Sequence, residues 1–156
     1  LADARIKAAS PHVPDLIIDR FYESVAAAPS VRTVVPMVLR EHLLRFHEEL
    51  TARSVDVELV IDTRVVDLLV ADPEMAAVID AVRGAETMQV LTAELPMRFG
   101  VWETPTEAGV IVYTDTGPHS VLVSSHDSAR RWAQTVYEEV AAEATPLARL
   151  LRRRGS

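Results

Sequence analysis

The chain has 156 residues, of which 49% are hydrophobic and 25% are charged, a balance typical of one globular domain. It contains no cysteine, which excludes disulfides, thiolate metal sites and cysteine nucleophiles. The formal net charge of −7 argues against a stand-alone nucleic-acid-binding protein, because contacts to phosphates need a basic surface. Apolar runs are too short for a transmembrane helix and no basic, apolar leader opens the chain, so we expect a cytoplasmic protein.

The first half of the chain alternates short β-type runs with amphipathic helical stretches. Strands are expected over residues 5–10, 31–35 and 55–61. Helices are expected over residues 15–28, 39–53, 63–70 and 73–82, the last one stopping near Gly84. This order predicts an α/β fold with βαβ units, a parallel sheet and right-handed crossovers that place helices on its faces.

The second half changes character, because its strands are joined by tight turns. Strands are expected over residues 87–92, 98–103, 110–114 and 120–124, with turns of hairpin length at 105–109 and 115–118. These strands are expected to be antiparallel and to extend the same sheet. A final helix opens near residue 127, with Asp127 or Ser125 as its N-cap. No linker is visible, so residues 1–156 are expected to form one domain.

The motifs of common catalytic and phosphate-binding sites are missing. The five glycines form neither a dinucleotide-binding loop nor a P-loop, and no G-x-S-x-G elbow is present. His42 and His47 are five residues apart and would point about 140° apart on a helix, which favours a solvated polar face over a metal pair. The run from Ser124 to Asp127 is interpreted as a helix cap, because a catalytic triad converges from separate elements. We therefore expect no metal, no cofactor and no catalytic residues.

The strongest argument for a binding site is topological. Ligands of open α/β sheets bind beyond the carboxyl ends of the parallel strands. Those ends bring His12, Met37, Asp62 and Arg64 to one edge of the sheet. Arg64 either holds an anionic ligand or pairs with Asp62.

An apolar and aromatic segment at residues 94–102 supplies further candidates. Its larger side chains, Met97, Phe99 and Trp102, line a pocket or belong to the core. The predicted small-molecule site consists of His12, Met37, Asp62, Arg64, Met97 and Phe99.

Several segments together resemble one known family of domains. They are residues 10–14, 57–62, 94–101 and 121–138. The most specific is the pattern D-x-A-x-x-W-A-x-x-x-Y-E, which runs from Asp127 to Glu138. The chain is similar, over most of its length, to the effector domain of archaeal winged-helix transcriptional regulators of the filament and methanogenesis-regulator type. That domain is related to the TrmB-type effector domains.

The resemblance implies a mixed sheet like half of a phospholipase D unit, without its catalysis. Phospholipase D chemistry needs the motif H-x-K-x-x-x-x-D, whereas the single lysine here, Lys7, follows Arg5 at the histidine position. The implied function is sensing of a small-molecule effector within a homodimer. Effector binding would then modulate DNA binding by another domain.

Both ends of the chain point to a piece of a larger protein. It opens on Leu1 and closes on Gly155 and Ser156. The family resemblance implies that the part expected upstream is a DNA-binding winged helix. Two alternatives stay open: a purely structural dimerisation domain without a ligand, and a small hydrolase-like enzyme.

Overall fold

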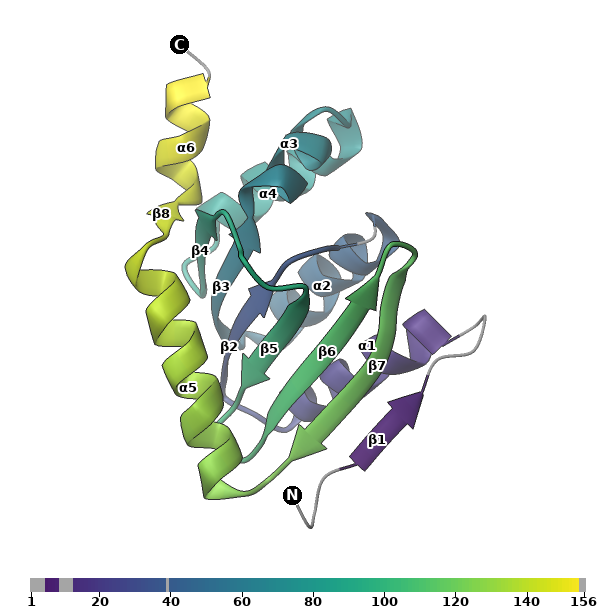
Figure 1. Cartoon of the computed structure of the whole chain (residues 1–156). Coiled ribbons are helices and arrows are strands. Elements are labelled where there is room, and N and C mark those ends of the chain that lie inside the picture. Colours follow the sequence, from purple (N-terminus) through teal and green to yellow (C-terminus); the bar gives the residue numbers. More distant parts are fainter. Residues whose placement is uncertain (1–4, 9–12, 39, 155–156) are drawn as a thin grey trace.

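An eight-stranded mixed sheet forms the centre of the computed structural model, which describes residues 5–8, 13–38 and 40–154 (Figure 1). The strand order is β1-β7-β6-β5-β2-β3-β4-β8. The strands are β1 (Arg5–Ala8), β2 (Ser30–Val35), β3 (Asp56–Asp62), β4 (Met88–Ala93), β5 (Phe99–Glu103), β6 (Ala108–Thr114), β7 (Gly117–Ser124) and β8 (Thr145–Pro146). The helices are α1 (Val13–Ala26), α2 (Arg40–Arg53), α3 (Thr63–Val70), α4 (Pro73–Gly84), α5 (Asp127–Ala142) and α6 (Leu147–Arg154).

The parallel part of the sheet is shifted along the chain relative to the prediction. β2, β3 and β4 are parallel, so the prediction of an antiparallel strand at 87–92 was wrong. α3 and α4 separate β3 from β4 and provide the long crossover that a parallel pair requires. β1, expected to open the parallel sheet, instead lies at its edge and pairs antiparallel with β7. Arg5 and Lys7 suit an edge strand, where charge discourages pairing with other chains.

Most other elements agree with the predicted periodicity to within a few residues. The antiparallel pairing of β5, β6 and β7 is confirmed. The N-cap of α5 is His126, not Asp127 or Ser125, and Asp127 stands inside the first turn, where its carboxylate bonds Arg130. β8 and α6 were not predicted, because Pro146 was taken as the end of the last helix.

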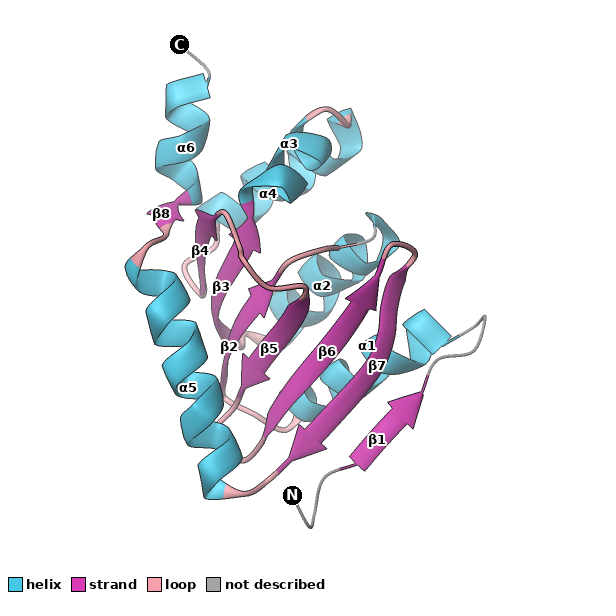
Figure 2. Ribbon diagram, in the orientation of Figure 1, coloured by secondary structure: helices cyan, strands magenta, loops and turns pink. Residues whose placement is uncertain are grey.

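Helices cover the two faces of the sheet unequally (Figure 2). α1, α2 and α4 pack on one face, around buried side chains such as Ile17, Leu50 and Trp102. α5 packs on the other face, against Val34 and Val60. Neighbouring strand residues point to opposite faces, so one strand contributes to both cores. α3, α4 and α6 form a third cluster beyond the carboxyl ends of β3 and β4.

Candidate functional site

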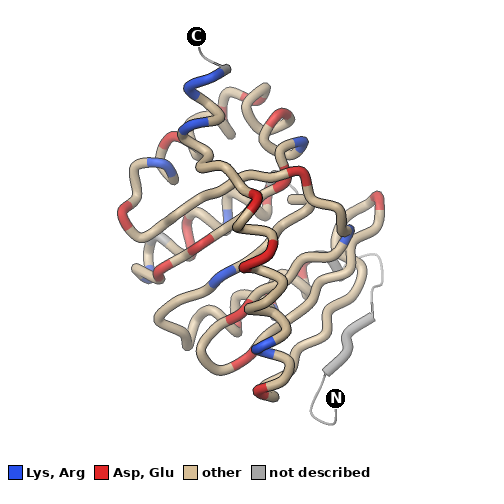
Figure 3. The backbone as a smooth tube through the Cα atoms, turned by 60° about the vertical axis from the view of Figure 1, so that its left-hand side comes forward, with Lys and Arg blue, Asp and Glu red and all other residues tan. Residues whose placement is uncertain are grey.

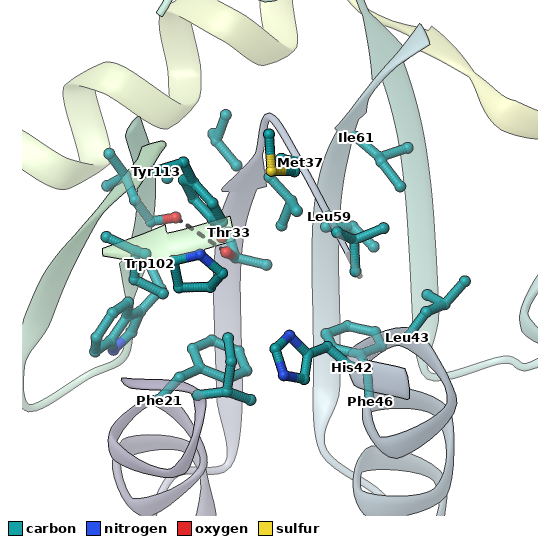
Figure 4. Close-up of a pocket in the computed structure, with 18 of the residues that line it drawn as sticks. Phe21, Thr33, Met37, His42, Leu43, Phe46, Leu59, Ile61, Trp102 and Tyr113 are labelled. Carbon is teal, nitrogen blue, oxygen red and sulfur yellow. Dashed lines mark hydrogen bonds between the residues drawn. The ribbon is translucent and has the colours of Figure 1, made fainter. Parts of the chain in front are cut away.

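A cavity lies between the sheet and helices α1 and α2, near the carboxyl ends of β2 and β3 (Figure 4). Its volume is about 70 Å³. One buried water needs roughly 10–15 Å³ on this measure, so the cavity has room for several atoms beyond one water. The lining residues are Ile18, Phe21, Tyr22, Thr33, Val34, Val35, Met37, Val38, His42, Leu43, Phe46, Leu59, Ile61, Gly100, Val101, Trp102, Ile111, Tyr113 and Pro118.

The walls of the cavity come from two helices and from five strands. α1 contributes Phe21 and α2 contributes Phe46 from their apolar stripes, since both are amphipathic. On the sheet side, Thr33 and Leu59 face these helices because they occupy inward positions of parallel neighbours. The cavity therefore depends on packing between segments that are distant in sequence.

Trp102 is the largest fully buried side chain and fixes one wall. Its indole N–H donates to the hydroxyl of Ser24 at 2.9 Å. Gly109 is its partner across the antiparallel pair of β5 and β6. A Cβ atom at Gly109 would stand 2.2 Å from the indole ring, so the ring lies against bare backbone. The orientation of Trp102 is thus set by a glycine and a serine from separate elements.

Few polar groups line the cavity, and several already have partners. The hydroxyl of Thr33 donates to the carbonyl oxygen of Val101 at 3.0 Å. His42 is buried, and its Nε2 lies 3.2 Å from the Oδ1 atom of Asp15. Burial raises the pKa of the Tyr113 phenol above its usual value, so this hydroxyl stays neutral at physiological pH.

The structure separates the residues that were predicted to form one site. Met37 lines the cavity, and so does Trp102. His12 falls outside the described residues. Asp62 and Arg64 lie at the start of α3, and Met97 packs with the core under α5.

Asp62 and Arg64 satisfy each other. Asp62 is fully buried and caps α3, accepting from the backbone N–H of Arg64 at 2.8 Å. The Arg64 guanidinium adds two bonds, at 3.0 and 2.7 Å, and the N–H of Leu95 adds a third partner at 3.2 Å. Burial acts to raise the pKa of Asp62, but these hydrogen bonds and the positive charge of Arg64 outweigh it, and the pKa falls below its usual value. The pairing of Asp62 with Arg64, one of the two readings of the sequence, is the one present.

Phe99 faces away from the cavity. It stacks on Trp132 of α5, with ring centroids 6.3 Å apart. The next residue, Gly100, lines the cavity, because alternation along β5 sends consecutive residues to opposite faces. Prediction of the cavity residue in β5, Phe99 or Gly100, therefore required knowing which face of the sheet borders the cavity.

Sequence reasoning missed several cavity residues. Phe21 and Phe46 were recognised only as parts of apolar helical stripes, which is how most such residues are used. His42 was interpreted as part of a polar face, yet it is buried against the cavity. A signal for it exists in the sequence, since His42 precedes Leu43 by one residue and Phe46 by four, the spacing of the apolar side of a helix.

The sequence of the chain matches the model of a family of regulator domains. Residues 14–143 match the family model described as the middle domain of the methanogenesis regulatory protein FilR1. The chain belongs to this family. The resemblance inferred from its sequence segments is thereby confirmed, and the domain is of a transcription-regulator type. No curated protein matches the chain in sequence.

Solved structures with the same fold have little sequence identity with the chain. TrmBL2, described as an archaeal chromatin protein, matches with a TM-score of 0.64 and 8% identity, over 92% of this chain. The chain spans about half the length of TrmBL2, 54% of it. NucT from Helicobacter pylori matches with a TM-score of 0.71 and 9% identity, over 93% of this chain and 99% of NucT. Nuc from Salmonella typhimurium, a phospholipase D family member, matches with a TM-score of 0.64 and 12% identity, over 92% of this chain and 98% of Nuc. These likenesses confirm the phospholipase-D-like fold.

Charged groups in the described part of the chain form no evident metal site. Within residues 5–8, 13–38 and 40–154, no cluster of three histidine or acidic side chains is arranged to hold a metal ion. None of the helices described is long and apolar enough to cross a membrane. Acidic and basic positions are interspersed along the backbone, with basic positions gathered on α6 (Figure 3).

The run from Ser124 to Asp127, which contains serine, histidine and aspartate, begins at the last residue of β7. Ser124 is buried, and its hydroxyl oxygen accepts a hydrogen bond from the backbone N–H of His126 at 3.2 Å. His126 itself is exposed. The membership in a regulator family favours a non-enzymatic role, although NucT and Nuc share the fold.

Proposed function

We propose that the chain is the ligand-sensing and dimerisation domain of a DNA-binding transcriptional regulator, and that the cavity beside β2 and β3 binds its effector. The cavity is the observation that carries this proposal. It lies where α/β sheets bind ligands, and Met37 at its edge belongs to the originally predicted site. Membership in a regulator family supports an effector over a substrate.

Coupling to DNA binding requires the effector to distinguish two states of the domain. The cavity is walled by α1 and α2 on one side and by the sheet on the other, so a bound molecule would change how these helices rest on the sheet. A DNA-binding domain joined to this chain would respond to that change. The chain would touch DNA only through such a domain.

A thermal-shift screen tests the sensing proposal, with sugars, acyl lactones, carboxylates and small aromatic compounds as classes. Any ligand of the folded state raises the melting temperature. Val35→Phe fills the cavity and should abolish the shift, whereas Val70→Phe makes the same change at an exposed position of α3 and should preserve it. Failure of every class, or a shift that Val35→Phe leaves unchanged, contradicts a sensing role for the cavity.

The dimer is proposed from an uncovered apolar strip on the α5 face of the sheet. Val112 and Trp132 are 45% and 46% exposed. A groove of about 330 Å³ is lined by Trp132 together with Val110 and Leu122. Contiguous apolar surface of this kind is uncommon on monomers. We propose a second copy of the chain as its occupant.

Charge at the two ends of the strip supports a twofold arrangement. Arg98 and Asp115 pair at the tip of the β6–β7 hairpin, and Asp127 and Arg130 pair in the first turn of α5. A twofold axis through the middle of the strip brings the hairpin tip of one copy to the α5 turn of the other. Each end then presents both charge signs to its counterpart, which allows opposite charges to meet in the reciprocal contacts of an isologous interface.

Mass measurement in solution tests the dimer. The unchanged chain should have twice the monomer mass, and Trp132→Glu should have the monomer mass with an unchanged circular dichroism spectrum. Leu68→Glu, at an exposed apolar position on α3, is the matched control and should remain dimeric. A monomeric unchanged chain, or a dimeric Trp132→Glu variant, contradicts this interface.

A further inference from the structure

The wall of the cavity is unusually rich in aromatic rings. Five of the eight aromatic residues of the chain line it: Phe21, Tyr22, Phe46, Trp102 and Tyr113. Phe21 makes edge-to-face contacts with Tyr22 at 5.2 Å and with Trp102 at 5.4 Å between ring centroids. Rings held in this way offer both edges and faces to a further ring, which is the geometry that aromatic pairs prefer.

Charged ligands do not suit this wall. The lining contains no Asp, Glu, Lys or Arg, and burial of an unpaired charge is costly. A carboxylate or phosphate would find no Lys or Arg in the wall, and the one imidazole there, that of His42, already contacts Asp15. A cationic ligand fares no better, because the Arg45 guanidinium already lies over the Tyr22 ring at 4.4 Å from its centroid.

Sugars are disfavoured for a different reason. A sugar needs a hydrogen-bond partner for each of several hydroxyl groups, or it leaves polar groups buried and unsatisfied. Here the hydroxyl of Thr33 and the indole N–H of Trp102 are both used within the protein. The remaining polar side chains of the wall are the phenols of Tyr22 and Tyr113 and the imidazole of His42, whose Nε2 already lies 3.2 Å from the Oδ1 atom of Asp15. They suit a ligand with one or two polar atoms.

Size sets a further limit. A cavity of roughly 150 Å³ admits benzene, and drug-sized ligands need about 300–1,000 Å³. The cavity here measures about 70 Å³, with the flexible thioether of Met37 at its edge. A six-membered ring therefore requires Met37 to move, and two fused rings would require still more space. Tyr113 adds a fixed hydroxyl, since its ring lies against the bare Cα of Gly100, where a Cβ would stand 3.2 Å from it.

We infer that the cavity takes a small uncharged compound with a single aromatic ring and one hydrogen-bonding group, with phenol as its simplest representative. This inference rests on the proposed function, because it names the ligand class of the same cavity. Tyr113 is the residue expected to bond the polar group of the ligand. The five aromatic side chains are expected to surround its ring.

Calorimetric titration of the full chain tests the ligand class with four probes: phenol, cyclohexanol, benzoate and glucose. Phenol should bind roughly 2- to 10-fold more tightly than cyclohexanol, because edge-to-face contacts add to simple apolar burial. Benzoate and glucose should give no binding heat. Val35→Phe should abolish phenol binding and Val70→Phe should retain it.

A second variant isolates the polar contact. Tyr113→Phe keeps the ring and removes the hydroxyl, so phenol should weaken roughly 5-fold while toluene is unchanged. Circular dichroism and the melting temperature show whether the variant is folded.

The outcomes separate this inference from the proposed function. If glucose or benzoate binds in a manner abolished by Val35→Phe while phenol does not bind, the ligand class is wrong and the sensing role stands. Phenol binding that survives Val35→Phe, or equal affinity for phenol and cyclohexanol, also overturns the aromatic class. If neither these probes nor any class in the thermal screen binds, both the inference and the sensing role are overturned.

Discussion

Two regions at the carboxyl ends of the parallel strands face each other across the sheet and differ in kind. On the α1–α2 side, β2 and β3 border a cavity whose wall is aromatic and uncharged. On the other side, the end of β3 is closed by Asp62, which Arg64 and Leu95 satisfy with hydrogen bonds. Both regions occupy the place where such sheets bind ligands, and the cavity lies in the first of them, on the α1–α2 side.

The difference shows that position along a strand is not sufficient to define a site. Ile61 and Asp62 are adjacent, and alternation sends the first to the cavity and the second to the helix cap. The charged pair resembles a site in the sequence because Asp and Arg are common ligand-binding residues. In the structure it is a helix cap with its own cation.

The largest effect is expected when the cavity wall itself is removed. Trp102→Ala should lower the free energy of unfolding by about 3–5 kcal/mol, because it deletes the largest buried side chain and leaves a larger void. Chemical denaturation measures this value. Trp132→Ala, on the half-exposed strip of the opposite face, is the matched control and should cost much less. If both variants lost the same free energy of unfolding, the tight packing of Trp102 in the cavity wall would be contradicted.

A smaller loss is expected from the glycine that supports this wall. Gly109→Ala places a Cβ atom against the Trp102 ring, and the overpacking should cost about 1–3 kcal/mol. Gly84→Ala is the control, since a Cβ there meets nothing within 4 Å and alanine favours the helix. Unfolding curves of the two variants should therefore separate clearly. Overlap of the Gly109→Ala curve with that of the unchanged chain would contradict the close contact seen here.

The sequence predicts the positions of the helices and strands along the chain better than it predicts which strands pair with each other. Helical and strand periodicity place α1 to α5 and β2 to β7 to within a few residues. The partner of β1 depended on a long-range pairing with β7, which local pattern does not encode. The parallel pairing of β4 with β3 would have been predicted only if α3 and α4 had been interpreted as the crossover between these two strands.

The site was predictable only in part, for a related reason. Topology directs attention to the strand ends, and Met37, which was predicted there, lines the cavity. Apolar patterns that are typical of a core contain Phe21, Phe46 and Tyr113. The local sequence does not distinguish a filled core from a core with a cavity. Whether Phe99 or Gly100 faces the cavity is decided by the register of β5 with β2 and β6.

The closed region should show its own, weaker effect and a pH dependence. Asp62→Ala removes the cap of α3 and should cost about 1–2 kcal/mol near neutral pH. The pKa of Asp62 is lowered in the folded state, so the stability it supplies is present above its unfolded pKa of about 3.9. That stability is lost as the pH falls through the lower folded pKa, and the variant should then approach the unchanged chain.

Urea denaturation at several pH values measures this convergence. Asp72→Ala removes an exposed cap of α4 and serves as the comparison, with a smaller cost expected. A difference between Asp62→Ala and the unchanged chain that stays constant into strong acid would contradict the charged role of Asp62.

The smallest effect is expected where sequence reasoning first placed an anion-binding group. The Arg64 side chain is 74% exposed, and its guanidinium already forms an ion pair with Asp62. Arg64→Gln should therefore leave the affinity for any cavity ligand unchanged, because the cavity lies on the other face of the sheet. The same calorimetric titration measures it, with Tyr113→Phe as the variant that does respond. If Arg64→Gln abolishes binding of an anionic ligand while Val35→Phe leaves it intact, the site is the closed region after all, and the helix cap must open to admit it. The two variants thus decide between the two faces, because one substitution acts only on the cap and the other only on the cavity.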